Sequence, residues 1–162
     1  VMGACMMVKR ALVDSVGLMN EAYFMYAEET DWQHRMHQAG WRVRFEPSAE
    51  VVHLGGGSSA RSWGSLYPRQ VTSTIRYLAT CVDLATAARA QRWMSVALRM
   101  RCGIYTIARW LPFGNRDEQA SRADAFAAAR HAVRELDIHA ASLPVIPHWT
   151  VKHAQGNSSI DR

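Results

Sequence analysis

The stretch Tyr23–Trp32 reads YFMYAEETDW and joins a run of aromatic and methionine side chains to three carboxylates within four residues. The packing side chains can hold the backbone while the acids project together from the start of a helix. Crowding like charges adds little to the stability of a folded protein. Two interpretations stay open: a reactive site, or a solvated helix N-terminus, where the helix dipole favours acids.

A helical pattern follows the acids. Residues 28–39 predict a helix, because apolar side chains recur there at helical spacing, and Gly40 just past them is suited to ending it. Asp31 and Arg35 are four residues apart on this helix. We therefore expect them to form an ion pair.

Three short segments around this helix predict β-strands. Residues 2–8 form an apolar run suited to a buried strand, and residues 49–54 form a second short strand. Residues 41–45 alternate strictly, which predicts that their apolar side chains point inward: Trp41, Val43 and Phe45. Residues 11–16 predict a short helix that ends at Gly17.

The second half of the chain has a different character. Residues 67–80, 85–111 and 121–136 predict helices, and residues 144–162 a loose tail. The net charge is −2 over residues 1–60, +7 over residues 61–110 and zero over residues 111–162. The basic middle third indicates an anionic partner: a membrane surface, a phosphorylated ligand or nucleic acid.

Two features carry candidate chemistry. The segment Tyr23–Trp32, with the carboxylates of Glu28, Glu29 and Asp31, is called the acidic turn below. One of its acids, placed in a cleft lined by aromatic side chains, is suited to act as a general base. The interpretation that Glu28 and Glu29 complement the helix dipole stays open beside it. His53 ends a predicted strand before a glycine-rich loop, where an imidazole can approach a ligand or metal. Isolated histidines are more often satisfied surface or core groups.

Taken together, these pieces resemble the second half of a family 2 glycosyltransferase of the GT-A fold, and within that family the rhamnosyltransferase-like enzymes of bacterial cell-surface polysaccharides. The matching run is GACMMVKRALVDSVGLMNEAYFMYAEETDWQHRMHQAGWRVRFEPSAEVVHLGGGSS, residues 3–59. The family pattern includes F-M-Y-x-E-[ED]-x-D-[WL], R-x-x-x-G-[WY], P-x-A-x-V-x-H and G-x-S. Their order and spacing over the whole run carry the resemblance.

The resemblance implies a role for each matching position. The catalytic base falls on Glu29, where many relatives have Asp. The positions on the acceptor side are Gly3, Ala4, Glu28, Asp31 and Trp32. For Glu28 and Asp31 the alternative is that they fix the local structure, and for Trp32 that it belongs to the core. His53 matches a histidine that in several relatives helps to ligate a divalent metal, Mg²⁺ or Mn²⁺.

The implied reaction is the inverting transfer of a sugar from a nucleotide-sugar donor to a saccharide or polyprenyl-diphosphate-linked acceptor. A sugar hydroxyl is a weak nucleophile, so a positioned carboxylate must take its proton as the new bond forms. The leaving nucleoside diphosphate develops charge that a divalent cation neutralises.

The expected fold class is therefore α/β. Residues 1–62 are expected to form the C-terminal, acceptor-side part of a GT-A catalytic domain, with short mixed strands and helices. Residues 63–143 are expected to form a mainly helical extension, basic and amphipathic, before the tail at 144–162. The chain has no D-x-D motif and no nucleotide-binding half. We therefore expect it to be a fragment of a longer enzyme, inactive alone; the alternative is a degenerate relative of the family.

The basic segment leaves alternatives open. Its helices either lie on the inner face of the cytoplasmic membrane, as in a peripheral cytoplasmic enzyme, or pack on the catalytic domain or form a homodimer. The rival function is a non-catalytic scaffold or interaction module that binds a membrane or nucleic acid through residues 61–110. Because residues 1–60 are net acidic and no known binding motif is present, nucleic acid is not the expected partner. Three widely spaced cysteines fit a reducing compartment.

Overall fold

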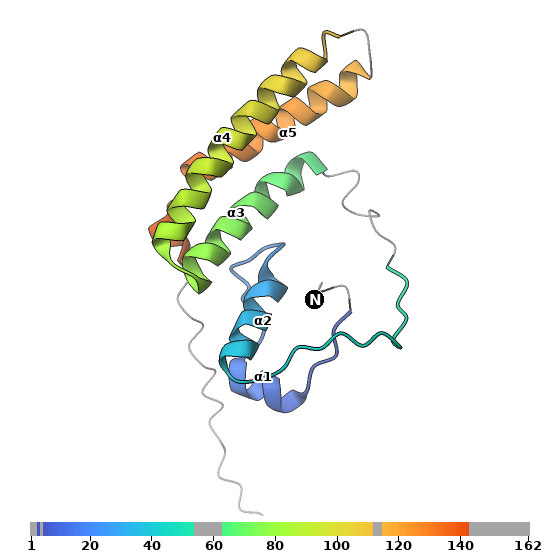
Figure 1. Ribbon diagram of the computed structural model, residues 1–162, viewed down its shortest axis with the longest axis vertical. Helices are drawn as coiled ribbons and strands as arrows, with labels where there is room; N and C mark the ends of the chain where they lie inside the picture. Colours follow the sequence, from blue (N-terminus) through green and yellow to red (C-terminus); the bar gives the residue numbers. More distant parts are fainter. Residues whose placement is uncertain (1–2, 4, 54–62, 112–114, 143–162) are drawn as a thin grey trace, which may run out of the picture.

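The computed structural model describes residues 3, 5–53, 63–111 and 115–142. The described residues form helices α1 (Arg10–Val16), α2 (Glu28–Gln38), α3 (Trp63–Cys81), α4 (Leu84–Ala108), α5 (Arg116–Glu135) and α6 (Ile138–Ala141). Figure 1 shows α4 and α5 running side by side, with α3 along them and α2 and α1 beyond α3. The fold is thus a helical hairpin, α4 and α5, to which the earlier helices are added in turn.

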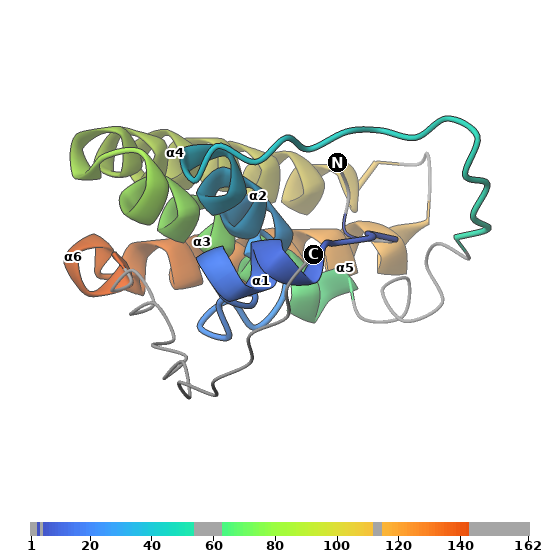
Figure 2. The same ribbon diagram turned by 90° about the horizontal axis from the view of Figure 1, so that it is seen from below.

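The larger apolar core joins α3, α4 and α5. Its buried side chains are Val71, Ile75, Ala79, Ala87, Leu98, Phe126, Ala129 and Val133. At one end Phe126 stacks on Tyr105, with 5.3 Å between ring centroids, and meets Tyr67 edge-on at 5.4 Å. At the other end, α6 packs against α3 and α4 (Figure 2).

A smaller core lies between α1 and α2. Its buried members are Leu12, Trp32 and Met36. The indole N–H of Trp32 donates to the carbonyl of Gly17 at 2.9 Å, which ties α2 to the residue that ends α1. Gly17 and Gly40 have φ angles of 75° and 81°, a left-handed conformation that glycine adopts without strain. Both glycines lie just past a helix, as the sequence predicted.

The prediction of an α/β GT-A half is wrong for the part of the chain that the structure describes. That part is mainly helical and contains no strand. The described residues among 2–8, and those of 41–45 and 49–53, have no helix or strand assignment. The side chains of Val43 and Phe45, which were expected to point inward, are exposed.

The physical reason is the lack of a pairing partner. A β-strand satisfies its backbone N–H and C=O groups only through a neighbouring strand. No other described segment forms a strand with which residues 41–53 could pair. The alternation of apolar and polar side chains in residues 41–45 therefore does not lead to a sheet. Alternation indicates which side chains a sheet would bury, and it does not supply the sheet.

The helices are confirmed, with changed bounds. Those predicted at 11–16 and 28–39 are α1 and α2, within one residue at each end. The helices predicted at 67–80 and 121–136 begin earlier, at Trp63 and Arg116. The earlier start of α5 has a local cause, because the side chain of Asn115 accepts hydrogen bonds from the N–H groups of Asp117 and Glu118.

No helix among the described residues is long and apolar enough to cross a membrane. The predicted tail, residues 144–162, lies outside the described residues, as does most of the glycine-rich segment before α3.

The core assignment predicts the effect of one truncation. Phe126→Ala removes a ring that is 3% exposed and contacts α3 and α4, so the free energy of unfolding should fall by about 3–5 kcal/mol. Phe45→Ala is the matched control. Its ring is 77% exposed, and the free energy of unfolding should change by less than about 0.5 kcal/mol. Urea titration followed by circular dichroism measures both, and equal losses would contradict the packing described.

Candidate functional site

In the acidic turn, the two residues directly before Glu28 have a left-handed backbone conformation. Tyr26 and Ala27 have φ angles of 69° and 71°, and Ala27 is the residue that caps α2. For residues other than glycine this conformation costs about 1–2 kcal/mol each, so surrounding contacts must hold it. One such contact comes from α3, where the Ser73 hydroxyl donates to the carbonyl of Met25 at 3.0 Å. Strained backbone of this kind is found at sites that position a functional side chain.

Asp31 lies at the centre of the contact between α2 and α3. It is 2% exposed, and both of its carboxylate oxygens accept hydrogen bonds. Oδ2 accepts from the Nε of Arg35 at 3.0 Å, which confirms the predicted ion pair. Oδ1 accepts from the thiol of Cys81, at the end of α3, at 3.3 Å. A buried carboxylate is tolerated only when it is paired and hydrogen-bonded in this way.

The guanidinium of Arg35 extends the same network to α1. It donates to the carbonyl of Val16, the last residue of α1, and to the carbonyl of Leu18 at 2.8 Å. Carbonyl groups at a helix C-terminus lack partners within the helix, and the helix dipole favours a cation there. Asp31 and Arg35 together therefore connect α1, α2 and α3.

Tyr23 is buried and Cys81 is half-buried, and both lie next to this carboxylate. Burial raises the pKa of the Tyr23 phenol, and the negative charge of Asp31 raises it further. Burial, together with the hydrogen bond to Asp31, raises the pKa of the Cys81 thiol to about 12. Both groups are thus neutral near pH 7, and Cys81 serves as a hydrogen-bond donor.

Glu28 and Glu29 lie on the first turn of α2 and are half-buried. In each, Oε2 is shielded from solvent and has no hydrogen-bond partner among the described residues. Gly3 lies directly against Glu29, because a Cβ atom at Gly3 would be 3.2 Å from the Cβ of Glu29. Shielded carboxylate oxygens without donors are unfavourable, so they are suited to accept a hydrogen bond from a ligand hydroxyl.

The other predicted site residues lie apart from this turn or outside the described part. Trp32 lies in the smaller core, 6% exposed, which favours its alternative role as a core residue. His53 is exposed, in a segment without regular structure. Ala4 lies outside the described residues. Of the predicted site residues, the structure brings Gly3, Glu28, Glu29 and Asp31 together. Asp31 fixes the local structure. Its contact with an acceptor stays a prediction.

A metal centre is not assembled by the described residues. No group of three or more His, Cys, Asp or Glu side chains among them lies close enough to hold a cation. His53 therefore belongs to no group of three such side chains in that part of the chain. The Mg²⁺ or Mn²⁺ that the resemblance implies, with His53 as one of its ligands, stays a prediction.

Sequence reasoning missed the residues that support the turn from α3. Ser73 and Cys81 follow their partners, Met25 and Asp31, by 48 and 50 residues. Arg69 places its guanidinium 4.2 Å from the ring centroid of Phe24, which holds an exposed aromatic side chain next to the turn. No local pattern in the sequence signals these contacts, because each joins segments that only the fold brings together.

Comparison with known proteins gives a partial match. A 77-residue stretch is 39% identical to N-acetylglucosaminyl-diphospho-decaprenol L-rhamnosyltransferase from Mycobacterium tuberculosis, in strains CDC 1551 / Oshkosh and ATCC 25618 / H37Rv alike. The match covers 48% of this chain and 25% of the length of each relative. No family model and no solved structure matches. Over about half its length, the chain is thus similar to a glycosyltransferase.

The buried ion pair predicts a large effect of a small substitution. Asp31→Asn leaves the guanidinium of Arg35 without its carboxylate in a buried setting, so the free energy of unfolding should fall by about 3 kcal/mol. Asp14→Asn is the matched control. It breaks the pair between Arg10 and Asp14, which has the same spacing but is exposed, and should cost less than about 1 kcal/mol. Similar values for the two substitutions in urea titrations would refute the central role of Asp31.

The raised pKa of the Cys81 thiol gives a second prediction. The thiolate is the reactive form, so at mildly alkaline pH, where the protein stays folded, iodoacetamide should alkylate Cys81 far more slowly than the exposed Cys5. Asp31→Asn should speed the reaction of Cys81, because a negative charge next to the thiol is removed. Mass spectrometry of the modified peptides measures both rates, with Cys5 as the internal reference. An unchanged rate for Cys81 in the variant would contradict the contact between Cys81 and Asp31.

Proposed function

We propose that the acidic turn is the acceptor side of an inverting glycosyltransferase site and that Glu29 is its general base. The observation that carries the proposal is a pair of shielded carboxylate oxygens, Oε2 of Glu28 and Oε2 of Glu29, which have no partner among the described residues and follow a strained loop. Between these two acids, the family resemblance assigns the base to Glu29. The similarity to rhamnosyltransferases supports the same class of reaction. Glu28 points in a direction about 100° away on the helix, so the two carboxylates can serve different roles.

In the proposed reaction, an acceptor hydroxyl donates its hydrogen bond to Oε2 of Glu29. As the hydroxyl oxygen forms its bond to the anomeric carbon of the donor, the proton passes to Glu29 and the nucleoside diphosphate leaves with the bonding electron pair. Attack from the face opposite the leaving group inverts the anomeric centre. The chain's own contribution is to hold one carboxylate in place, with Gly3 against one side of the Glu29 side chain.

The substrates follow by analogy from the relative's name, which specifies transfer of L-rhamnose to N-acetylglucosaminyl-diphospho-decaprenol. We propose a nucleotide-sugar donor and a saccharide acceptor linked to a polyprenyl diphosphate. Because the match spans a quarter of that relative, the chain is proposed to act as part of a larger catalytic unit.

The base assignment is tested in a chimera. A stretch of this chain that includes Glu28 and Glu29 replaces the aligned residues of the M. tuberculosis rhamnosyltransferase, and rhamnosyl transfer to the lipid-linked acceptor is measured. Glu29→Gln removes the proton acceptor at constant size, so kcat should fall by about 10²–10⁴-fold. Glu29→Asp should restore part of the activity, because the carboxylate is kept with a shorter reach.

Glu28→Gln is the matched control, because Glu28 shares the first turn of α2 and also has a shielded oxygen. It should lower kcat far less than Glu29→Gln. Transfer at a near-normal rate in the Glu29→Gln chimera would exclude Glu29 as the base. It would also favour a scaffold role for the chain. An inactive parent chimera would count against the proposed equivalence of the two stretches.

A further inference from the structure

Helix α4 is apolar on two opposite faces. One face contributes the buried side chains Ala87 and Leu98 to the core. The other carries an exposed apolar stripe: Trp93, Val96, Met100, Ile104 and Ile107, which are 49–73% exposed. At 3.6 residues per turn these five positions lie within an arc about 80° wide, opposite Ala87 and Leu98. A helix at the surface of a globular protein usually places polar side chains there, so the stripe indicates an interaction surface.

Cations border the stripe, and the helix carries no acid to offset them. The sequence of α4, LATAARAQRWMSVALRMRCGIYTIA, contains four arginines and no Asp or Glu. By helical position, Arg92 and Arg99 flank the stripe on the side toward α5, and Arg101 flanks it on the other side. An apolar stripe with cations along its edge, chiefly on the side toward α5, suits a partner that is apolar at its centre and anionic at its edge.

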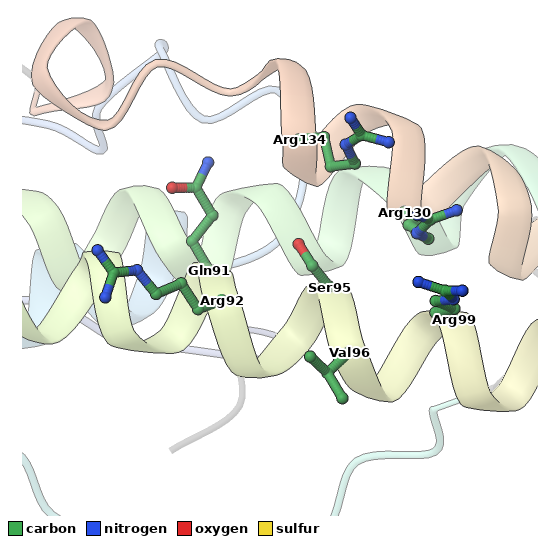
Figure 3. A pocket seen from close by; sticks show the side chains of 7 residues that line it. All are labelled: Gln91, Arg92, Ser95, Val96, Arg99, Arg130 and Arg134. Atoms are coloured by element: carbon green, nitrogen blue, oxygen red, sulfur yellow. The ribbon is translucent and has the colours of Figure 1, made fainter.

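A groove between α4 and α5 concentrates this charge. It has a volume of about 490 Å³ and is lined by Gln91, Arg92, Ser95, Val96, Arg99, Arg130 and Arg134. Figure 3 shows Arg99 of α4 and Arg130 of α5 lying opposite each other, with Arg134 beside them on α5. No carboxylate lines the groove, and none of its four arginines has an ion pair with another described residue. Like charges this close repel, so the groove favours an anion between them.

The groove and the stripe are continuous. Val96 belongs to both: it lines the groove and is the second residue of the stripe. A ligand phosphate bound by the arginines would therefore lie at the edge of the apolar surface. That arrangement matches the cross-section of a membrane surface, where phosphate headgroups border the acyl chains.

We propose that this face of α4 and α5 docks on an anionic membrane surface, with the apolar stripe entering the headgroup–acyl boundary and the arginine groove binding lipid phosphate. The stripe disfavours nucleic acid and soluble phosphates as the ligand, because neither covers apolar side chains. A second copy of the chain would bring two uncompensated arginine grooves toward one another. The proposal does not depend on Glu29 or on any catalytic activity.

The test is co-sedimentation of the full 162-residue chain with vesicles. The chain should bind vesicles of equal parts phosphatidylglycerol and phosphatidylcholine at low ionic strength, and bind less as salt is added. The double variant Arg99→Glu, Arg130→Glu should weaken partitioning by about 30-fold or more, because each arginine near an anionic surface contributes about fivefold. Ile104→Glu should also abolish binding, because it places a charge in the stripe.

The matched control is the double variant Arg42→Glu, Arg44→Glu. It changes the net charge by the same amount at two exposed positions outside the helices, and it should keep most of the binding. All substituted side chains are exposed or line the open groove, so circular dichroism should show unchanged helix content in every variant.

Three outcomes would overturn the proposal. One is binding to vesicles of pure phosphatidylcholine that is as strong as binding to anionic vesicles, or binding to anionic vesicles that stays unchanged in the groove and stripe variants. Another is calorimetric binding of inorganic diphosphate, or of duplex nucleic acid, by a chain that does not bind vesicles. The last is a dimer in analytical ultracentrifugation that Ile104→Glu converts to a monomer, in a chain without vesicle binding, which would assign the stripe to a second copy.

Discussion

The buried carboxylate of Asp31 is the constraint on which the first half of the structure depends. Its two oxygens accept hydrogen bonds from Arg35 on its own helix and from Cys81 on α3. Arg35 in turn donates to two backbone carbonyls, one in the last residue of α1 and one just past that helix. A charge this deeply buried must be satisfied from every side, so it leaves little freedom in how the three helices meet. With α2 fixed in this way, the strained residues before it and the acids Glu28 and Glu29 take up one defined position.

The two proposals concern different parts of the molecule and fit one mode of action. The acidic turn lies at the start of α2, whereas the basic and apolar face belongs to α4 and α5 (Figure 1). Helix α3 contacts both parts and connects them. A chain held on an anionic lipid surface by α4 would be suited to meet an acceptor that is itself anchored by a lipid. Either proposal can fail without the other, because they share no residue.

The sequence predicted local features well and long-range ones poorly. Helical spacing and terminal glycines located α1 and α2, and the four-residue spacing of Asp31 and Arg35 anticipated their pair. The early start of α5 was also readable, in the N-cap residue Asn115 followed by Asp117 and Glu118. The predicted strands are absent from the described residues, because alternation at 41–45 leads to burial only where a neighbouring strand exists. Ser73 and Cys81 contact the acidic turn, and Arg99 faces Arg130 across a groove, only because helices distant in the sequence pack together. No local sequence pattern predicts these contacts.

The claim that Asp31 holds the acidic turn against α3 is tested most directly by hydrogen exchange in the Asp31→Asn variant. Amide exchange should become faster in residues 23–38, while α4 and α5, which rest on the separate core around Phe126 and Val133, keep their protection. The Asp14→Asn variant, with its exposed pair broken, should exchange like the parent chain. Unchanged protection of residues 23–38, or a uniform loss across all helices, would contradict the account.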